Sequence, residues 1–171
     1  LRPEWHRWDE FAVARSHAMG SDSLVSTRSI HFTVDNPLQA NEMFDEITYT
    51  KGASILRMLE RFVGEDVFQK GIQSYISAHQ FSNATTNDLW VAIGQAANLD
   101  VAALMKNWVL EKGYPLVSIT QADSALNLSQ RRFFLITPPG APPKVVWRVP
   151  LSLREEQSSE AQKFCLEEQT K

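Results

Sequence analysis

Apolar side chains recur every three or four residues from residue 3 to about residue 113, which predicts a helical region. At its start, Trp5, Trp8 and Ala12 fall on one helical face, so an amphipathic helix is expected there. Gly20 is the expected end of this helix. Residues 21–42 are rich in turn formers and are expected to form a long connection with only short structure.

Further stretches with the same period predict helices that pack against one another through apolar stripes. The stripes comprise Ile55, Leu56, Leu59, Phe62 and Val63; Phe68, Ile72, Tyr75, Ile76 and His79; Leu89, Trp90 and Ile93; and Leu104, Met105 and Trp108. Gly64 supplies the expected end of the first stripe. Thr85 or Thr86 is expected to cap the third helix and Asp100 the fourth. Gly113 then ends the helical region.

After Pro115 the period of the apolar positions changes to two, which predicts strands. The candidate strands are residues 116–120, 125–129, 132–137 and 145–154. In the last of these, alternation predicts one buried face, and Pro150 predicts an edge strand or a bulge because proline cannot donate to a ladder. The polar tail from residue 155 is expected to be a linker, a frayed helix or the broken start of another element. The predicted fold class is α+β, mainly α.

The composition of the chain limits the classes of function that it can have. A chain of 171 residues with 43% hydrophobic residues can build a core for one domain or two small ones. The net charge of -3 argues against binding to nucleic acid or to an anionic membrane. No apolar run is long enough for a membrane segment, and no signal-peptide core is present. The lone Cys165 excludes an intrachain disulfide, and together with the lack of a targeting segment it favours the cytoplasm.

The four histidines do not form a metal-binding pattern. His6 and His17 share a helical face but lie about 16 Å apart along the axis at 1.5 Å per residue, too far to share an ion. His31 and His79 have no histidine partner three or four positions away, so no two-histidine helical zinc motif can be written. All four are therefore expected to be structural or surface residues, and the predicted metal ligands on this chain are none.

The stretch "MFDEITYTKGASILRMLE", residues 43–60, places Tyr49, Lys51 and Gly52 directly before an apolar helix. A tyrosine at a helix start is usually a packing residue with a locally satisfied hydroxyl. Helix N-termini, however, expose unpaired amides and positive potential that suit a developing oxyanion, and Lys51 adds a charge. Gly52 allows close backbone approach. From these residues alone, packing and chemistry remain open for Tyr49.

The string "FDEITYTKGASILRML" resembles the Tyr-x-Lys-Gly-Ala signature of the aminopeptidase N family of zinc metallopeptidases. The resemblance extends from residue 1 to about residue 154. The other segments that look like this family, in the expected order, are "RPEW", "HAMGSDSL", "VGEDVFQKGIQSYISAH", "SNATTNDLW" and "NWVLEKGYPLVSIT".

This resemblance implies a domain plan and a role for Tyr49. Residues 1–115 would be the later, helical half of a thermolysin-like catalytic domain, 116–155 the start of a small antiparallel β-sandwich, and 156–171 a polar linker or tail. The resemblance implies that Tyr49 donates a hydrogen bond to the oxygen of the tetrahedral intermediate, opposite a zinc ion. The implied substrates are peptides with a free amino terminus. No substrate-binding residue is assigned.

The departures from the family pattern leave an alternative open. The His-Glu-x-x-His zinc motif, the downstream glutamate ligand and the Gly-x-Met-Glu-Asn loop are absent here and lie upstream in the family. The chain alone is therefore expected to bind no zinc and to hydrolyse no peptides without an upstream catalytic half of the same protein. In "STRSIHF", Arg28 and Ser29 stand where family members commonly have His-Pro. The alternative is a catalytically inactive, aminopeptidase-like scaffold for protein binding.

Overall fold

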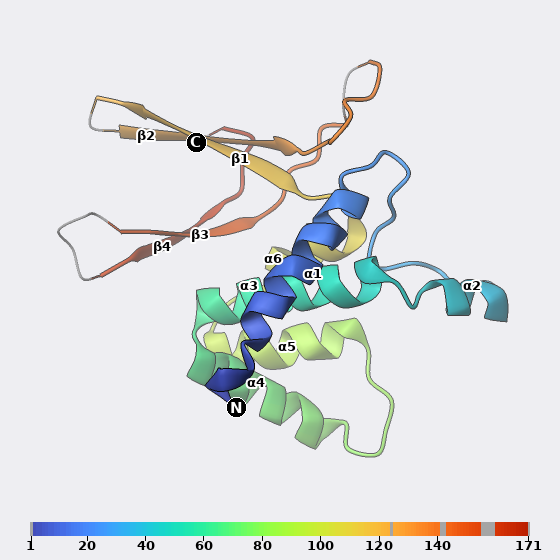
Figure 1. Cartoon of the computed structure of the whole chain (residues 1–171). Coiled ribbons are helices and arrows are strands. Elements are labelled where there is room, and N and C mark those ends of the chain that lie inside the picture. Colours follow the sequence, from blue (N-terminus) through green and yellow to red (C-terminus); the bar gives the residue numbers. More distant parts are fainter. Residues whose placement is uncertain (1, 124, 141–142, 155–159, 171) are drawn as a thin grey trace.

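A group of helices is followed by two antiparallel pairs of strands in the computed structural model, which describes residues 2–123, 125–140, 143–154 and 160–170 (Figure 1). This architecture confirms the predicted α+β class. The helical elements are the 3-10 helix η1 (Pro3–Trp5), α1 (Arg7–Asp22), α2 (Pro37–Glu42), the π-helical turn η2 (Ile47–Lys51), α3 (Gly52–Val63), α4 (Glu65–Ala78), α5 (Thr86–Ala97) and α6 (Val101–Leu110). The strands are β1 (Pro115–Ala122), β2 (Ala125–Arg132), β3 (Val149–Leu153) and β4 (Gln162–Leu166).

The helix boundaries follow the predicted capping signals. Thr85 and Asp88 form a reciprocal capping box at the start of α5, and the Asp100 carboxylate accepts a hydrogen bond of 2.9 Å from the Ala103 amide at the start of α6. Gly64 ends α3 with φ 99°, a conformation in which a side chain would be strained. Local sequence therefore determines where these helices begin and end.

The opening helix differs from its prediction. Trp5 and Trp8 remain 54% and 55% exposed, whereas the residues that α1 buries are Ala18 and Asp22 near its end. The predicted face therefore packs only in part: Trp8 and Ala12 line a hollow against α3, where the Arg57 guanidinium lies 3.7 Å from the centroid of the Trp8 ring, but the buried residues of α1 lie near its end. The expected long connection with short structure is confirmed, since α2 lies within it and extends away from the other helices (Figure 1).

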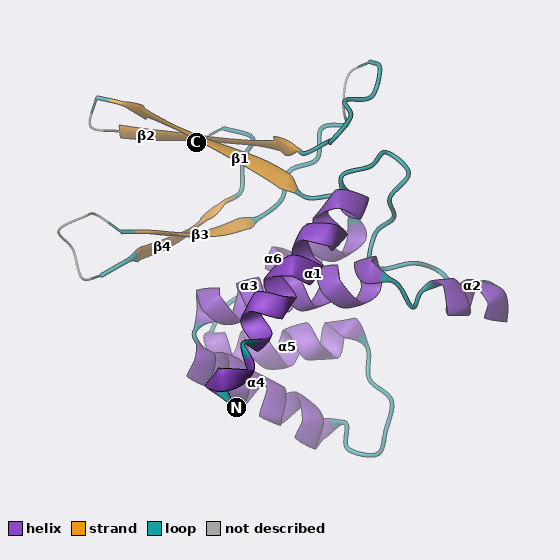
Figure 2. Cartoon of the chain, viewed as in Figure 1, coloured by secondary structure: helices purple, strands orange, loops and turns teal. Residues whose placement is uncertain are grey.

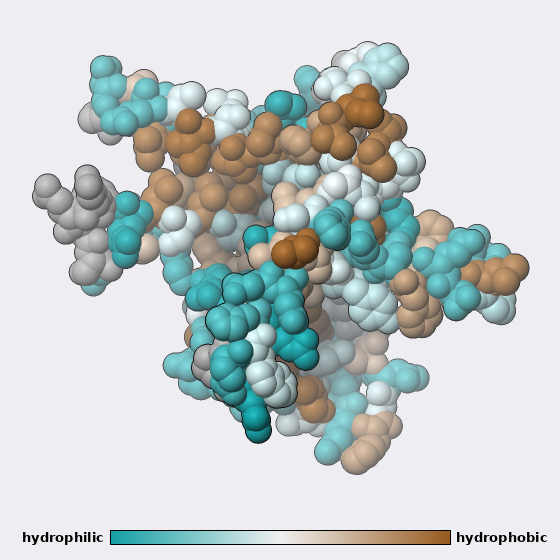
Figure 3. Space-filling view, viewed as in Figure 1, coloured by the Kyte–Doolittle hydropathy of each residue, from teal (hydrophilic) through white to brown (hydrophobic). Residues whose placement is uncertain are grey.

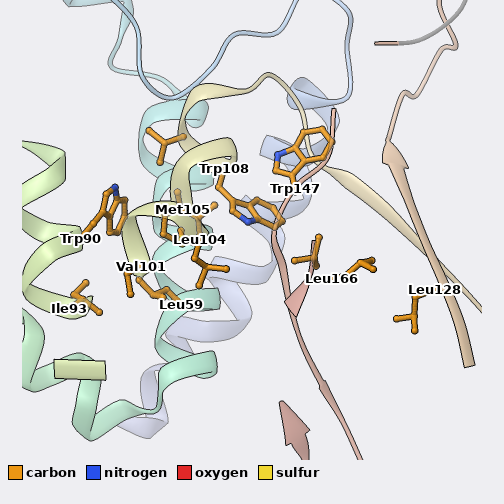
Figure 4. Close-up of a cluster of buried hydrophobic side chains, with 13 residues drawn as sticks. Leu59, Trp90, Ile93, Val101, Leu104, Met105, Trp108, Leu128, Trp147 and Leu166 are labelled. Atoms are coloured by element: carbon orange, nitrogen blue, oxygen red, sulfur yellow. The ribbon is translucent and has the colours of Figure 1, made fainter. Parts of the chain in front are cut away.

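The helical core lies between α3, α4, α5 and α6 (Figure 4). Leu59, Ile93 and Met105 are fully buried there, as their stripes predict. At Gly71 of α4 a Cβ atom would lie 2.7 Å from the Ile93 Cα atom, so only glycine allows α4 and α5 to approach this closely. Burial of most stripe positions holds this part of the fold together, but the prediction for Ile76 is wrong, since that side chain is 57% exposed.

Two hairpin-like pairs form the strand region (Figure 2). The β1–β2 ladder runs from Pro115↔Arg132 to Ala122↔Ala125, which confirms the predicted strands at 116–120 and 125–129. The β3–β4 ladder pairs Pro150 with Cys165, so the proline sits in a two-stranded sheet where both strands are edges, as predicted. Residues 145–148 precede β3 without forming strand.

One prediction about this region is wrong, and the alternatives for another are now decided. Residues 132–137 form no strand beyond Arg132, because only the Phe133 amide still bonds the segment before β1, at the Tyr114 carbonyl, whereas the Leu135 amide donates to the Ser23 carbonyl after α1. For the polar tail, a linker, a frayed helix and the start of another element were open, and residues 162–166 fit the last of these, since they form β4 and Leu166 is fully buried. A strand with a weak alternating pattern is specified by its partner, here β3. Residues 155–159 and 171 of this tail lie outside the described part of the chain.

Buried polar groups connect the strand pairs to each other and to α6. The Gln130 side chain of β2 donates to the Trp147 carbonyl (2.8 Å) and accepts from the Trp147 amide (2.9 Å). From α6, the Trp108 indole donates to the Arg148 carbonyl at 2.8 Å, and the Asn107 side chain donates to the Val146 carbonyl at 2.6 Å. Since unpaired buried backbone groups are costly, these bonds fix the segment before β3 against α6.

Truncating the buried Leu59 side chain tests the helical core. Leu59→Ala is expected to lower the free energy of unfolding by about 2–5 kcal/mol, because it leaves a cavity among α3, α5 and α6. Urea unfolding followed by circular dichroism measures the change. The matched control is Ile76→Ala on α4, whose side chain is 57% exposed. An equal loss in both variants would contradict this placement of the core.

Candidate functional site

Tyr49 lies in the middle of η2, and its side chain is 59% exposed. Its amide donates to the Asp45 carbonyl at 3.1 Å, and its ring lies 6.2 Å from the ring of Phe44, centroid to centroid. The hydroxyl of Tyr49 is thus carried on an ordered backbone and directed away from the core. It is available to a group outside this chain.

The predicted helix N-terminus at Tyr49 is wrong. The π-helical turn η2 runs directly into α3, so the helical segment already begins at Ile47. The exposed amides of that start are occupied, because the Asp45 carboxylate accepts from the Ile47 and Thr48 amides at 3.0 and 2.9 Å. Any hydrogen bond from this position to a developing oxyanion therefore comes from the Tyr49 hydroxyl and not from the Ile47 or Thr48 amide.

Lys51 and Gly52 also differ from their predicted roles. Lys51 is only 7% exposed, and its ammonium contacts the Asp22 carboxylate at 2.8 Å and donates to the Gly113 carbonyl at 2.9 Å. Its charge is therefore used inside the protein. Gly52 has φ −54°, and nothing would lie within 4 Å of a Cβ atom there, so the expected close backbone approach is absent from the described part of the chain.

Asp22 is the acceptor at the centre of this buried cluster. Besides Lys51, its carboxylate accepts from the Thr27 hydroxyl at 2.9 Å and from the Gly113 amide at 3.1 Å. These bonds join the end of α1, the loop after it, η2 and the turn before β1. These donors replace the hydrogen bonds to water that the buried carboxylate has lost.

Burial lowers the pKa of Lys51 below its ordinary value of 10.5, and the nearby Asp22 opposes that shift. Arg132 and Arg28 lower the pKa of Lys51 further through like-charge repulsion. Burial also lowers the pKa of Arg132, whose guanidinium packs against Gly113. Lys51 and Arg132 thus both lie near the buried Asp22 carboxylate, whose charge opposes the lowering of their pKa values.

A second polar network lies beside Tyr49. The Arg28 guanidinium donates from Nη2 to the Asp45 carboxylate at 2.6 Å and to the Thr48 hydroxyl at 2.7 Å, and from Nε to Asp45 at 3.3 Å. Arg28 is 17% exposed in this pair and Asp45 is 39% exposed. The sequence interpretation missed this contact. Asp45 before a helix is a recognisable cap, but nothing in the sequence indicates a partner at Arg28, 17 residues earlier.

An apolar cavity of about 230 Å³ lies between α1 and α3. It is lined mainly by Met19, Ile55, Met58, Trp108 and Tyr114, and it reaches the Asp22 and Lys51 side chains. Tyr49 is not part of its lining. The cavity and the exposed hydroxyl are therefore separate features of the molecule.

The described residues provide no group that fits a zinc site. Within residues 2–123, 125–140, 143–154 and 160–170, no three histidine, cysteine, aspartate or glutamate side chains are grouped so that they could hold a metal ion. None of the helices in those ranges is both long and apolar enough to cross a membrane.

Comparisons with known proteins identify the family. The Peptidase family M1 domain matches residues 1–108. Leucyl aminopeptidase of Saccharolobus solfataricus is 37% identical over 154 residues, which are 90% of this chain and 19% of that protein. Aminopeptidase M1 of Arabidopsis thaliana is 39% identical over 153 residues, 90% of this chain and 17% of that protein. Tricorn protease-interacting factor F2 of Thermoplasma acidophilum is 38% identical over 159 residues, 91% of this chain and 20% of that protein.

The chain belongs to peptidase family M1, the aminopeptidase N family, which confirms the resemblance found in the sequence. Tyr49, Asp45 and Arg28 all lie within the matched residues 1–108. The chain spans about a fifth of the length of the relatives named above, which are 17% to 20% covered.

The buried ion pair between Lys51 and Asp22 is expected to contribute to the stability of the fold. Lys51→Met is expected to lower the free energy of unfolding by about 3–5 kcal/mol, because the Asp22 carboxylate is left buried without its cation. Adding Asp22→Asn is expected to recover part of this loss, because the amide oxygen still accepts from Thr27 and Gly113 without a charge. Urea unfolding measures both variants, and a double variant less stable than Lys51→Met would contradict the prediction.

The same variant tests the lowered pKa of Lys51. Between the folded pKa and the ordinary value of 10.5, the unfolded chain binds more protons than the folded chain. The stability contributed by Lys51 is therefore expected to rise with pH across that window. The difference in unfolding free energy between wild type and Lys51→Met should grow in favour of wild type from neutral pH towards 10.5. A difference that shrinks or stays constant would show that the pKa is not lowered.

Proposed function

We propose that this chain is part of a longer zinc aminopeptidase that removes the N-terminal residue of peptides, with Tyr49 stabilising the tetrahedral oxyanion. The observation that carries the proposal is the exposed Tyr49 side chain, held on η2 inside the segment that matches peptidase family M1. The names of the matched relatives, a leucyl aminopeptidase and an aminopeptidase M1, support the reaction class.

The proposed role of Tyr49 follows from the chemistry of amide hydrolysis. When water adds to the scissile carbonyl, its oxygen gains negative charge that is absent in the bound substrate. A neutral phenol held within hydrogen-bond reach donates more strongly to that oxygen than to the ground-state carbonyl. The hydrogen bonds of the η2 backbone limit the reorganisation that the phenol needs when charge develops. The zinc ion and the groups that bind the substrate would come from residues outside this chain.

The domain plan remains part of the proposal. We assign residues 1–115 to the later, helical part of the catalytic domain and the strands from residue 116 to the start of a β-sandwich. Apolar side chains gathered over the strand region support this assignment (Figure 3). Ile119, Leu126, Leu135 and Ile136 are 45% to 73% exposed there. Such side chains suit contact with further strands.

Replacing the Tyr49 hydroxyl tests the proposed role. Tyr49→Phe in the full-length protein is expected to lower kcat/KM for a peptide substrate by about 100- to 1000-fold, the usual effect of losing one oxyanion donor. The loss should appear in kcat, with KM little changed, because the bond forms only as charge develops.

The matched control is Tyr75→Phe, another tyrosine hydroxyl removed from a helix of the same region, where the ring lies 5.4 Å from that of His79. It is expected to leave kcat/KM nearly unchanged. If Tyr49→Phe lost less than about tenfold, or 1.4 kcal/mol, the proposed role would be excluded.

Zinc content separates this function from the alternative of an inactive scaffold for protein binding. The full-length protein is expected to contain about one zinc ion per chain and to lose hydrolysis when a chelator removes it. Atomic absorption and peptide hydrolysis measure the two properties. A folded full-length protein without zinc and without hydrolysis would favour the scaffold.

A further inference from the structure

The Arg28 guanidinium bridges two residues that precede Tyr49. It contacts both oxygens of the Asp45 carboxylate and, through Nη2, the Thr48 hydroxyl at 2.7 Å. Its Nη1 donates to the Ser29 carbonyl at 2.9 Å, so the guanidinium is itself fixed in orientation. Because the donors of arginine lie in a rigid plane, such a two-pronged contact fixes angles as well as distance.

Asp45 transmits this restraint to the backbone of η2. One Asp45 carboxylate oxygen accepts from the Ile47 and Thr48 amides as well as from Arg28, and the Asp45 carbonyl accepts from the Tyr49 amide at 3.1 Å. Asp45 thus accepts hydrogen bonds from the amides of Ile47, Thr48 and Tyr49, three of the five residues of η2. Arg28 sets the orientation of the carboxylate on which these bonds depend.

Packing provides little alternative support for this side of η2. Ile47 and Lys51 face inward and are buried, but Tyr49 is 59% exposed and its ring neighbour Phe44 is 71% exposed. The π-helical turn is a rare conformation with poorer hydrogen-bond geometry than an α-helix. An exposed side chain on such a turn depends on polar contacts to hold its backbone.

We propose that Arg28 is a positioning residue for Tyr49, acting through Asp45 and Thr48 to orient the turn that carries the tyrosine hydroxyl. This inference rests on the proposed function of Tyr49. It also gives the "STRSI" loop a role in the active enzyme, because the loop supplies the guanidinium that holds η2.

The test uses Arg28→Ala and Arg28→Lys in the full-length enzyme with a peptide substrate. Arg28→Ala is expected to lower kcat by about 10- to 100-fold with KM within about threefold, since small misplacements of a catalytic group reduce the rate and not the binding. Arg28→Lys is expected to recover little, because one ammonium cannot bond Asp45 and Thr48 in the same plane. Added guanidinium ion should restore part of kcat in Arg28→Ala and none in Arg28→Lys.

A double variant separates positioning from a general structural effect. In the Tyr49→Phe background, Arg28→Ala is expected to lower kcat by less than about twofold, because the hydroxyl it positions is already gone. Equal losses with and without the hydroxyl would overturn the proposal. The matched control is Arg57→Ala, which should leave kcat unchanged. Arg57 pairs with Glu60 on α3, and the two side chains are 24% and 20% exposed.

Three further cases complete the test and separate the positioning role from the proposed function. If Arg28→Ala does not fold, Thr48→Val carries the test. It removes one acceptor of the guanidinium and is expected to lower kcat by about 3- to 10-fold, and an unchanged kcat would overturn the proposal. If Tyr49→Phe loses activity while Arg28→Ala keeps it, the positioning role alone fails. If Tyr49→Phe keeps full activity, the proposed function fails and the positioning role with it.

Discussion

The buried ion pair between Lys51 and Asp22 is the contact on which the arrangement of this chain depends. It joins the end of α1 to η2, and through Gly113 it reaches the turn before β1. Removing both charges from water is costly, and the hydrogen bonds from Thr27 and Gly113 to Asp22 offset that cost. Because Lys51 is fixed inward, the turn that contains it has one defined orientation.

That orientation gives two residues of the "YTKGA" motif different surroundings, one buried and one exposed. Lys51 faces the core, whereas Tyr49, two positions earlier, is exposed on the opposite side of the same turn. The motif that identifies peptidase family M1 therefore combines a packing residue and a candidate catalytic residue. Arg28 and Asp45 support the exposed side of η2, as Lys51 and Asp22 support the buried side. A rare π-helical turn is thereby held by an ion pair on each side.

Several parts of the fold could be predicted because their determinants are local. Thr85 and Asp100 cap their own helices, and the stripes containing Leu59 and Ile93 are buried as their period requires. Predictions failed where a distant partner decides the outcome. Residues 133–137 pair with no strand after the Phe133 amide has bonded the Tyr114 carbonyl, and the tail, which the sequence left open, gains β3 as a partner at residues 162–166. Trp8 follows the helical period but is 55% exposed, with the Arg57 guanidinium of α3 against its ring.

The sequence by itself determined the family, the caps of α5 and α6 and the candidate Tyr49, because motifs, caps and periodicity depend on neighbouring residues. Only the tertiary structure decided the roles of Lys51 and Arg28. Their partners, Asp22 and Asp45, lie 29 and 17 residues away along the chain. A charged side chain near a helix start is equally compatible with a buried pair, an exposed cation or a catalytic group. Burial and the position of the opposite charge distinguish these roles, and both are properties of the folded chain.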